Sequence, residues 1–332
     1  MSGAKPPVAV VGAGRMGRGI AHVFAYAGHH VTLVDVKERP SDQTAAVLAE
    51  ARREIDAGIA FLATLGVLSE AQSEAVLGRI SFLGPDGHDG AVEAAEVVFE
   101  AVPEVMATKR TVLGRIAAAA RPDTVIASAT STIEADTLAE LVAGPERFLN
   151  AHWLNPAYLV PLVEVSAARE TAPEITARLV RLLEAAGKVP VVCAASPGFI
   201  VPRIQALAMN EAARLVEEGV ASADDIDKAT RLGLGFRFAV LGLLEFIDWG
   251  GGDILHYASD HLAEALGDER FRAPEVVRRN MATGAVGMKT GRGFHDFSDR
   301  DVDAYRRETL AKFVALAKHL GLLPPPGGID RD

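Results

Sequence analysis

The sequence predicts an α/β fold in which a doubly wound sheet forms the N-terminal part and an all-helical domain follows. Three observations predict it. A short apolar run at 8–11 leads into a glycine-rich turn at 12–17, and a helical pattern follows that turn. Strand-like and helical stretches then alternate as far as about Ala195. Beyond Gly198 the pattern is helical throughout, which indicates a domain boundary.

The chain length and composition agree with two globular domains. A chain of 332 residues is longer than a single hydrophobic core usually supports. We expect a domain over residues 1–195, a helical domain over 196–298 and a helical C-terminal extension over 299–332. Hydrophobic residues make up 49% and charged residues 23%, which is typical of soluble globular proteins.

Charge and cysteine content exclude several kinds of partner. The net charge is -10 without a Lys and Arg cluster, so neither nucleic acid nor an anionic membrane is an expected partner. Cys193 is the one cysteine, so no internal disulfide is possible. The N-terminus lacks the features of a signal peptide. Together these observations predict a cytoplasmic protein.

The first elements have the features of a Rossmann-type, dinucleotide-binding unit. The run at 8–11 predicts a buried parallel strand. The G-x-G-x-x-G that follows consists of Gly12, Ala13, Gly14, Arg15, Met16 and Gly17. Gly12 allows a tight turn, Gly14 a close approach of the backbone to a pyrophosphate, and Gly17 close packing of the helix on the strand. The helix N-terminus adds free amides and the positive end of its dipole.

The second strand, residues 30–35, ends in an acid, Asp35. A carboxylate there accepts hydrogen bonds from the adenosine ribose and repels a 2′-phosphate. A G-x-G-x-x-G alone indicates only a glycine-rich turn, but the strand, the helix ended by Gly28 and this acid all agree. The sequence therefore predicts NAD as the cofactor.

Two helical stretches, 44–65 and 69–77, come next, which is more than a simple crossover requires. We expect them to form a projecting arm at about 44–78. Its charges, which include Arg52 and Arg53, are of mixed sign, as on a solvated surface.

Polar residues follow the next two strands, 97–101 and 125–128. Glu100 and Glu104 lie at the carboxyl end of the first, where open α/β sheets bind ligands, and a helix with Lys109 follows. Ser131 follows the second, and two interpretations of it have equal weight. Either Ser131 and Glu134 form a capping box for a helix that begins there, or Ser131 contacts substrate.

A histidine and a carboxylate, His152 and Glu164, lie in two short strand-like segments between residues 150 and 165. Asn155-Pro156 and Pro161 indicate a turn between the segments. If the strands lie side by side, Glu164 meets His152, which is the arrangement that a general acid/base of fixed tautomer needs. An ordinary hydrogen-bonded pair is the alternative.

The second half of the chain consists of helical stretches. They are expected at 173–186, 199–218, 224–230, 243–249, 254–266, 274–280 and 301–319, with a strand at 188–193 and a turn at Gly233-Leu-Gly235. A helical domain after a nucleotide-binding one usually supplies the other wall of an active-site cleft, and often a subunit interface.

Several motifs now carry a resemblance over residues 8 to about 297. They are V-G-A-G-R-M-G-R-G-I-A (11–21), F-E-A-V-P-E (99–104), S-A-T-S-T-I (128–133), A-H-W-L-N-P (151–156), L-V-E-V (162–165), S-P-G-F-I-V (196–201) and M-K-T-G-R-G-F (288–294). In order and spacing the chain resembles the 3-hydroxyacyl-CoA dehydrogenase superfamily, and 3-hydroxybutyryl-CoA dehydrogenases in particular.

The resemblance implies NAD-dependent, reversible oxidation of a secondary alcohol to a ketone without a metal ion. It implies that His152 is the general acid/base, that Glu164 orients it, and that Ser131 and Asn155 contact the substrate. Its cofactor contacts fall on the glycine loop, Asp35, Glu104 and Lys109. It also implies a homodimer formed through the helical domain.

Three departures from the family pattern lie on the substrate side. Pro202 stands where the family usually has Asn, and it has neither a side-chain donor nor an N–H. Ala129 replaces the Asn of S-N-T-S. Arg237 and Phe238 stand where a Pro and a small residue are common.

From the resemblance, the expected substrate is a short-chain (S)-3-hydroxyacyl-CoA such as 3-hydroxybutyryl-CoA, with Arg52 or Arg53 as CoA contacts. The alternative is a free hydroxy acid, as used by the related L-carnitine and L-gulonate dehydrogenases. Arg237 is then a clamp for a carboxylate instead of a surface charge. A third hypothesis is a dinucleotide-binding sensor or structural protein that has lost activity. The presence of His152 and Glu164 argues against it, whereas Pro202 keeps it open.

Overall fold

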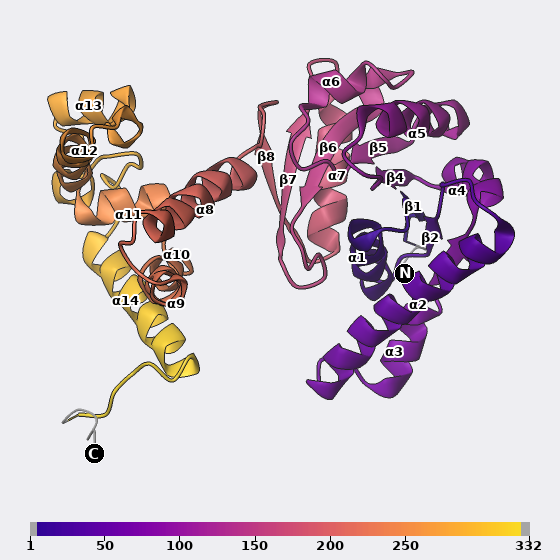
Figure 1. The fold of residues 1–332 in the computed structure, drawn as a ribbon, viewed down its shortest axis with the longest axis horizontal. Helices are drawn as coiled ribbons and strands as arrows, with labels where there is room; N and C mark the ends of the chain where they lie inside the picture. The colour runs from indigo at the N-terminus through magenta and orange to yellow at the C-terminus, as the bar shows by residue number, and fades with distance from the viewer. Residues whose placement is uncertain (1–4, 327–332) are drawn as a thin grey trace. The chain divides into compact units, whose positions relative to one another are not determined.

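The computed structural model describes residues 5–326 and divides the chain into two compact units, residues 1–209 and 210–332 (Figure 1). Each unit is described here by itself. The first helix of the second half, α8 (Val201–Glu217), runs across this division. The domain limits at 195 and 298 stay predictions.

The first unit is built on an eight-stranded sheet of order β3-β2-β1-β4-β5-β6-β7-β8. The strands are β1 (Val8–Val11), β2 (Val31–Val34), β3 (Ile80–Leu83), β4 (Val97–Glu100), β5 (Val125–Ser128), β6 (Phe148–Trp153), β7 (Leu162–Ala167) and β8 (Val189–Cys193). All neighbours are parallel except β6 and β7. The strand order reverses at β1, so the carboxyl ends of β1 and β4 flank the crevice where such sheets bind ligands.

Helices cover both faces of this sheet. They are α1 (Arg15–Tyr26), α2 (Ser41–Thr64), α3 (Glu70–Leu77), α4 (His88–Ala94), α5 (Met106–Ala119), α6 (Ala135–Ala139) and α7 (Pro173–Ala185). Val8 and Val10 of β1 belong to a core with α1, α2, α3 and α7, whereas Ala9 and Val11 belong to a core with α4, α5 and α6. Alternate residues of a strand point to opposite faces, so β1 contributes to both cores. The predicted doubly wound α/β fold is confirmed.

The predicted arm consists of α2 and α3, which pack against each other and extend beyond the sheet in Figure 1. Ala51, Ile55 and Ile59 bury one side of α2 in the core. Ser69 and Gln72 begin α3 with a reciprocal capping box. The pair is therefore a stable extension of the first unit.

The second unit is helical, as predicted. Besides the end of α8 it contains α9 (Ala223–Ala229), α10 (Phe236–Phe238), α11 (Leu243–Gly250), α12 (Gly252–Leu266), α13 (Glu275–Ala282) and α14 (Val302–His319). The turn predicted at Gly233-Leu-Gly235 is wrong, because Thr230–Gly235 is a π-helical segment that joins α9 to α10. Gly235 has helical φ and ψ of -57° and -45°. Glycine permits a turn there but does not impose one.

Asp248 organises the M-K-T-G-R-G-F segment of this unit. Its carboxylate is buried and accepts hydrogen bonds from the backbone N–H groups of Phe294 and His295, at 2.9 and 2.8 Å. A Cβ on Gly293 would lie 2.0 Å from Asp248 Oδ1. The second glycine of this motif is therefore required by close approach to a buried acid.

No helix within residues 5–326 combines the length and the apolar composition that crossing a membrane requires.

His22 makes the stability of the first unit depend on pH. The imidazole is buried on α1 and stacks on the Tyr158 ring, with 4.7 Å between centroids. Burial, with a smaller effect of the Lys188 ammonium, lowers the pKa of His22 from 6.5 to about 4. Between these values the unfolded chain binds the proton more strongly, so stability is complete above pH 6.5 and falls towards pH 4.

We expect His22→Phe to remove this dependence while keeping an aromatic ring beside Tyr158. Between pH 6.5 and 4 the wild type should lose about 3 kcal/mol more free energy of unfolding than the variant. Urea denaturation at a series of pH values measures the difference. Parallel stability curves for the two proteins would show that His22 does not titrate on unfolding.

Candidate active site

A groove of about 1070 Å³ lies at the carboxyl ends of β1, β2 and β4 in the first unit. The residues that line it come from the glycine turn, the segments after β2 and β4, and the end of β5. Among them are Gly12, Gly14, Arg15, Met16, Asp35, Lys37, Arg39, Glu104 and Ser131. The groove thus brings together most residues that the sequence predicts at the cofactor.

Glycine stands at the three motif positions for different physical reasons. Gly12 has a φ of +120°, and a Cβ there would lie 2.6 Å from the Ala101 carbonyl oxygen. A Cβ on Gly17 would lie 1.9 Å from the Gly12 carbonyl oxygen. A Cβ on Gly14 would meet no atom within 4 Å, yet Gly14 lines the groove. Gly12 and Gly17 are therefore needed by the fold, whereas the free space at Gly14 is available to a ligand.

We expect Gly14→Ala and Gly17→Ala to affect different properties. The Gly14→Ala methyl group enters only the groove, so NADH should bind about 10-fold more weakly while the melting temperature stays within about 2 °C of wild type. Gly17→Ala forces β1 and α1 apart and should cost about 3 kcal/mol of stability. NADH fluorescence titration and thermal unfolding measure both effects. A large loss of stability in Gly14→Ala would contradict the assignment of that space to a ligand.

Asp35 fits a ribose hydroxyl. Its carboxylate is 5% exposed and lines the groove directly after β2. Oδ2 lies 3.1 Å from Nη1 of Arg39 but accepts no well-directed hydrogen bond from any described residue. Such a buried acceptor with a spare lone pair costs free energy unless a donor reaches it. The N-terminus of α1 has no side-chain cap, so its free amides fit the pyrophosphate.

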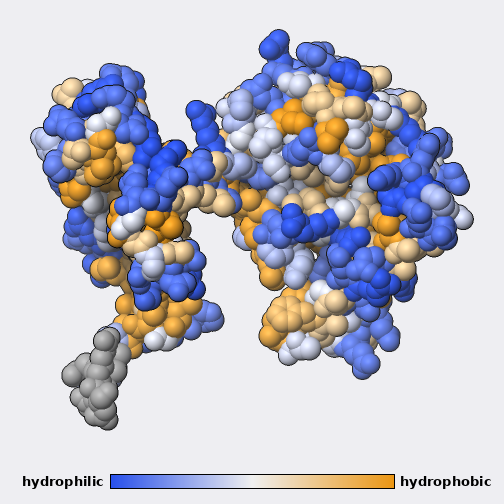
Figure 2. Space-filling view, viewed as in Figure 1, coloured by the Kyte–Doolittle hydropathy of each residue, from blue (hydrophilic) through white to orange (hydrophobic). Residues whose placement is uncertain are grey.

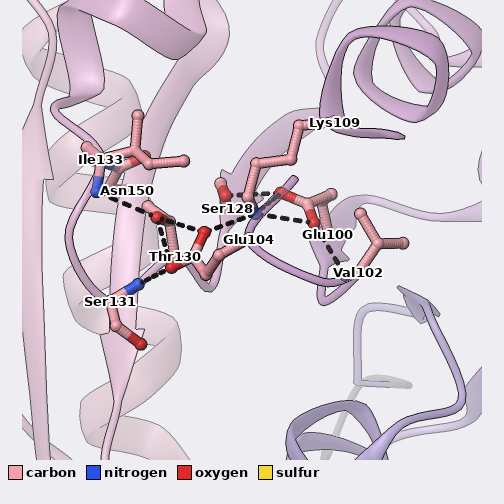
Figure 3. Close-up of polar contacts among 9 residues, drawn as sticks. All are labelled: Glu100, Val102, Glu104, Lys109, Ser128, Thr130, Ser131, Ile133 and Asn150. Carbon is pink, nitrogen blue, oxygen red and sulfur yellow. Dashed lines mark hydrogen bonds and ion pairs between the residues drawn. The ribbon is translucent and has the colours of Figure 1, made fainter. Parts of the chain in front are cut away.

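Glu104 accepts hydrogen bonds from the segment that follows β5 (Figure 3). The Thr130 hydroxyl donates to it, with distances of 2.8 and 2.9 Å to the two carboxylate oxygens, and the Ser131 N–H donates to Oε1. Glu104 therefore has a fixed position in the groove wall.

Lys109 lies behind that wall. Its ammonium is 1% exposed and lies 3.0 Å from Glu100 Oε2 and 3.4 Å from Glu104 Oε2. Glu100 is completely buried and also accepts from the Ser128 hydroxyl and the Val102 N–H. Lys109 thus neutralises two carboxylates, and its direct contact with the cofactor stays a prediction.

The capping role expected for Ser131 is wrong. Helix α6 begins at Ala135, with Glu134 as the N-cap residue and no side-chain cap. The Thr130 hydroxyl, not that of Ser131, accepts from the backbone of this segment, at 3.2 Å from the Ile133 N–H. Because Glu104 orders residues 130–131, the chain enters α6 later than the capping pattern suggests. The exposed Ser131 side chain is left facing the groove.

His152 and Glu164 lie directly opposite each other on the antiparallel strands β6 and β7. His152 Nδ1 is 2.7 Å from Glu164 Oε2, and both side chains are buried. The other carboxylate oxygen, Oε1, accepts from the N–H groups of Ile200 and Val201, each at 2.8 Å. The backbone N–H groups bind one carboxylate oxygen, so the other faces the imidazole. The structure thus brings together the pair that the sequence predicts.

The backbone that holds Glu164 is itself unusual. Phe199 has a φ of 44°, which is rare for a bulky residue, and its ring stacks on the His152 imidazole with 5.5 Å between centroids. Pro202 follows in the first turn of α8, where its missing N–H removes no intrahelical hydrogen bond.

The remaining predicted substrate residues lie in different places. Asn155 is exposed just beyond the end of β6. On the arm, Arg52 stacks over Phe82, with 5.8 Å from its guanidinium to the ring centroid, and Arg53 pairs with Glu50. In the second unit, Arg237 lies 4.7 Å over the Phe246 ring, and its Nε donates to the Gly233 carbonyl at 2.6 Å.

Comparison with known proteins identifies the chain. Residues 7–196 match the family model "3-hydroxyacyl-CoA dehydrogenase, NAD binding domain", and residues 198–297 match "3-hydroxyacyl-CoA dehydrogenase, C-terminal domain". The chain belongs to the 3-hydroxyacyl-CoA dehydrogenase family. It is an NAD-dependent oxidoreductase that acts on a CH–OH group, as its relatives in this family are.

Its relatives differ in the substrates that their names state. A protein of Mesorhizobium japonicum named 5-formyl-3-hydroxy-2-methylpyridine 4-carboxylate 5-dehydrogenase is 32% identical, over 94% of this chain and 97% of that protein. A probable 3-hydroxybutyryl-CoA dehydrogenase of Deinococcus radiodurans is 35% identical, over 87% of this chain and 99% of that protein.

Solved structures show the same fold. The 3-hydroxyacyl-CoA dehydrogenase of Archaeoglobus fulgidus matches with a TM-score of 0.75 and 33% identity, over 96% of this chain and 100% of that one. A crystal structure of a 5-formyl-3-hydroxy-2-methylpyridine 4-carboxylic acid 5-dehydrogenase matches with a TM-score of 0.67 and 30% identity, over 95% and 98%. Family membership fixes the cofactor and the reaction class, and both kinds of relative share the fold.

Proposed function

We propose that the protein oxidises a short-chain (S)-3-hydroxyacyl-CoA, such as 3-hydroxybutyryl-CoA, to the 3-ketoacyl-CoA, and catalyses the reverse reaction. The observation that carries this proposal is the His152–Glu164 pair, with a 2.7 Å contact at Nδ1. Two relatives, each matched over nearly its whole length, are named probable 3-hydroxybutyryl-CoA dehydrogenases, which supports the choice of substrate.

The pair defines where the proton goes. Glu164 accepts from Nδ1–H, so the lone pair of the neutral imidazole lies at Nε2, which takes the proton of the substrate hydroxyl. The imidazolium that forms is stabilised by Glu164, and in reduction it returns the same proton to the ketone oxygen. The chemistry that bound NAD supplies is acceptance of the hydride from the carbinol carbon. The Ser131 hydroxyl and the Asn155 amide orient the substrate oxygen.

A substrate panel tests the proposal. We expect oxidation of NADH, followed by its absorbance, to be fastest with acetoacetyl-CoA among acyl-CoA and free keto acid substrates. No oxidation of NADH with any acyl-CoA, or a faster reaction with a free keto acid than with every acyl-CoA, would contradict the proposed substrate.

A free hydroxy acid is the second candidate, and Arg237 is the observation that favours it. Nε and the guanidinium face are occupied by Gly233 and Phe246, so the side chain has a fixed direction. No described residue bonds its two terminal nitrogens, which form the fork that binds a carboxylate. Arg53, by contrast, is already paired with Glu50, which weakens its role as a CoA contact. The Mesorhizobium relative, whose named substrate is a pyridine carboxylate, supports the same choice.

We expect Arg237→Ala to raise KM for a free hydroxy acid about 30-fold, because a bidentate charged pair contributes roughly 2 kcal/mol. KM for an acyl-CoA should change less than about threefold. Steady-state kinetics on both classes measures the difference, with Arg231→Ala in the preceding π-helical segment as the charge-matched control. Unchanged kinetics of Arg237→Ala on every accepted substrate would remove the clamp.

A homodimer and a cytoplasmic location also remain our proposals. Large apolar side chains are exposed along α12 of the second unit, namely Ile254, Tyr257, Leu262 and Leu266. Figure 2 shows apolar surface on this unit. Exposed apolar surface of this extent is typical of subunit interfaces.

A further inference from the structure

We infer that Arg39 and Lys37 form a latent binding site for a 2′-phosphorylated adenosine, and that the Asp35 carboxylate keeps this site closed. The inference concerns the adenosine end of the groove. It rests on the cofactor site of the first unit and does not depend on which alcohol the enzyme uses.

Arg39 and Asp35 form a close ion pair with one hydrogen bond. Nη1 of Arg39 lies 3.1 Å from Asp35 Oδ2, and Nη2 lies 3.4 Å from Oδ1. The side chains of Arg39 and Asp35 are 16% and 7% exposed, and both residues line the groove. The guanidinium is thus held beside the acid that is expected to receive the ribose hydroxyls.

Asp35 is the one partner of Arg39 within residues 5–326. If the carboxylate is removed, the guanidinium loses its counter-ion, and its N–H groups are free for another anion at the groove. A planar guanidinium with two free N–H edges binds a phosphate in the same forked manner as a carboxylate.

Lys37 adds a second positive charge at the same end of the groove. Its side chain is exposed and makes no ion pair with any described residue, whereas its backbone N–H is 3.5 Å from Asp35 Oδ1. Arg18, which also lines the groove, is occupied by Glu54 and by the Ala13 carbonyl. Glu38 is exposed and does not line the groove. Asp35 is therefore the one acid among the described residues that contacts either cation.

The ligand class follows from the position. The acid after the second strand is where the ribose 2′-hydroxyl of NAD binds and where dinucleotide-binding proteins that use NADP place an arginine. This chain has both groups in contact. Asp35 excludes the 2′-phosphate in two ways, because it repels a dianion and because it is the counter-ion of the Arg39 guanidinium. The preference for NAD over NADP therefore depends on one carboxylate.

Fluorescence titration of the full chain with NADH and NADPH tests the inference. The wild type should bind NADH more tightly. We expect Asp35→Ser to tighten NADPH relative to NADH by about 100-fold, and Asp35→Ser with Arg39→Ala to lose most of that gain, since one forked charged pair accounts for about 10- to 100-fold. Asp35→Asn, which keeps the side-chain size, gives the same comparison if the serine variant is unstable. Arg110→Ala, at an exposed position of α5 outside the groove, controls for charge.

Two results would overturn the inference. One is an NADPH to NADH ratio in Asp35→Ser and Asp35→Asn equal to that of the wild type. The other is a gain that persists fully when Arg39 is replaced, which would assign the effect to lost repulsion alone. Competition by adenosine 2′,5′-bisphosphate and by 5′-AMP confines the effect to the adenosine end. Because no alcohol or ketone is present, failure here leaves the proposed substrate untouched, and failure of the substrate panel leaves this inference untouched.

Discussion

Replacing His152 by Gln should lower kcat by at least about 1000-fold, because general acid/base catalysis by a positioned imidazole contributes up to about 10⁴-fold. Glutamine fills part of the same space and can still bond Glu164, but it has no group that takes up a proton near neutral pH. The groove that we expect to bind the cofactor does not include His152 and is lined mainly by the segments that follow β1, β2, β4 and β5. NADH should therefore bind nearly as well as in the wild type, whereas turnover collapses.

Stopped-flow turnover and NADH titration on the same preparation separate the two effects. His30→Gln is the matched control, since His30 is exposed just before β2. If His152→Gln kept more than about a tenth of wild-type turnover, the proton would have another acceptor and the proposed chemistry would be wrong.

The second large effect is expected from Glu164→Gln, about 100- to 1000-fold in kcat. The Ile200 and Val201 N–H groups require an acceptor, so the amide oxygen of the variant stays with them. The amide NH₂ then faces His152 Nδ1 and donates to it. This moves the imidazole proton to Nε2, the nitrogen that has to accept the substrate proton. The neutral variant also gives the imidazolium less stabilisation.

NADH affinity and melting temperature, measured beside kcat over a range of pH, distinguish this tautomer effect from damage to the fold. Glu164→Gln should keep wild-type NADH affinity and melting temperature while kcat falls at every pH. Glu104→Gln, in the groove wall, should instead weaken NADH binding, because Glu104 lines the groove. A kcat for Glu164→Gln equal to wild type at saturating substrate would show that the pair is only structural.

Much of the first unit could be predicted because its physical rules are local. Short, mainly apolar runs predicted most of the strands, and the glycines of the turn predicted close contacts that the structure shows at Gly12 and Gly17. The opposition of His152 and Glu164 could be expected because a turn between two strands leaves few registers.

The failures have tertiary causes. The sequence pattern at Ser131 satisfies a capping box, but Glu104, far away in the chain, binds residues 130–131 and moves the helix start to Ala135. Gly233 and Gly235 suggest a turn, but the segment continues as a helix. A residue's local preference is overridden when a distant group supplies better hydrogen bonds.

Part of the site had no signal in the sequence. The two N–H groups that hold Glu164 belong to Ile200 and Val201, and a backbone donor carries no side-chain mark. The positive φ of Phe199 is equally hidden, because glycine or asparagine is the usual sign of such a position. The sequence did not indicate the ion pair of Arg39 with Asp35, because only the structure gives the distance between the two side chains.

The antiparallel pairing of β6 with β7 has a consequence for folding fidelity. In a sheet, a slip of one residue turns every side chain of a strand to the opposite face. A chain refolded with such a slip would separate His152 from Glu164, although β1, β2 and β4, whose ends form the groove proposed for NADH, would be unaffected. Turnover per bound NADH would then measure the fraction of refolded molecules in which β6 and β7 pair in the native register.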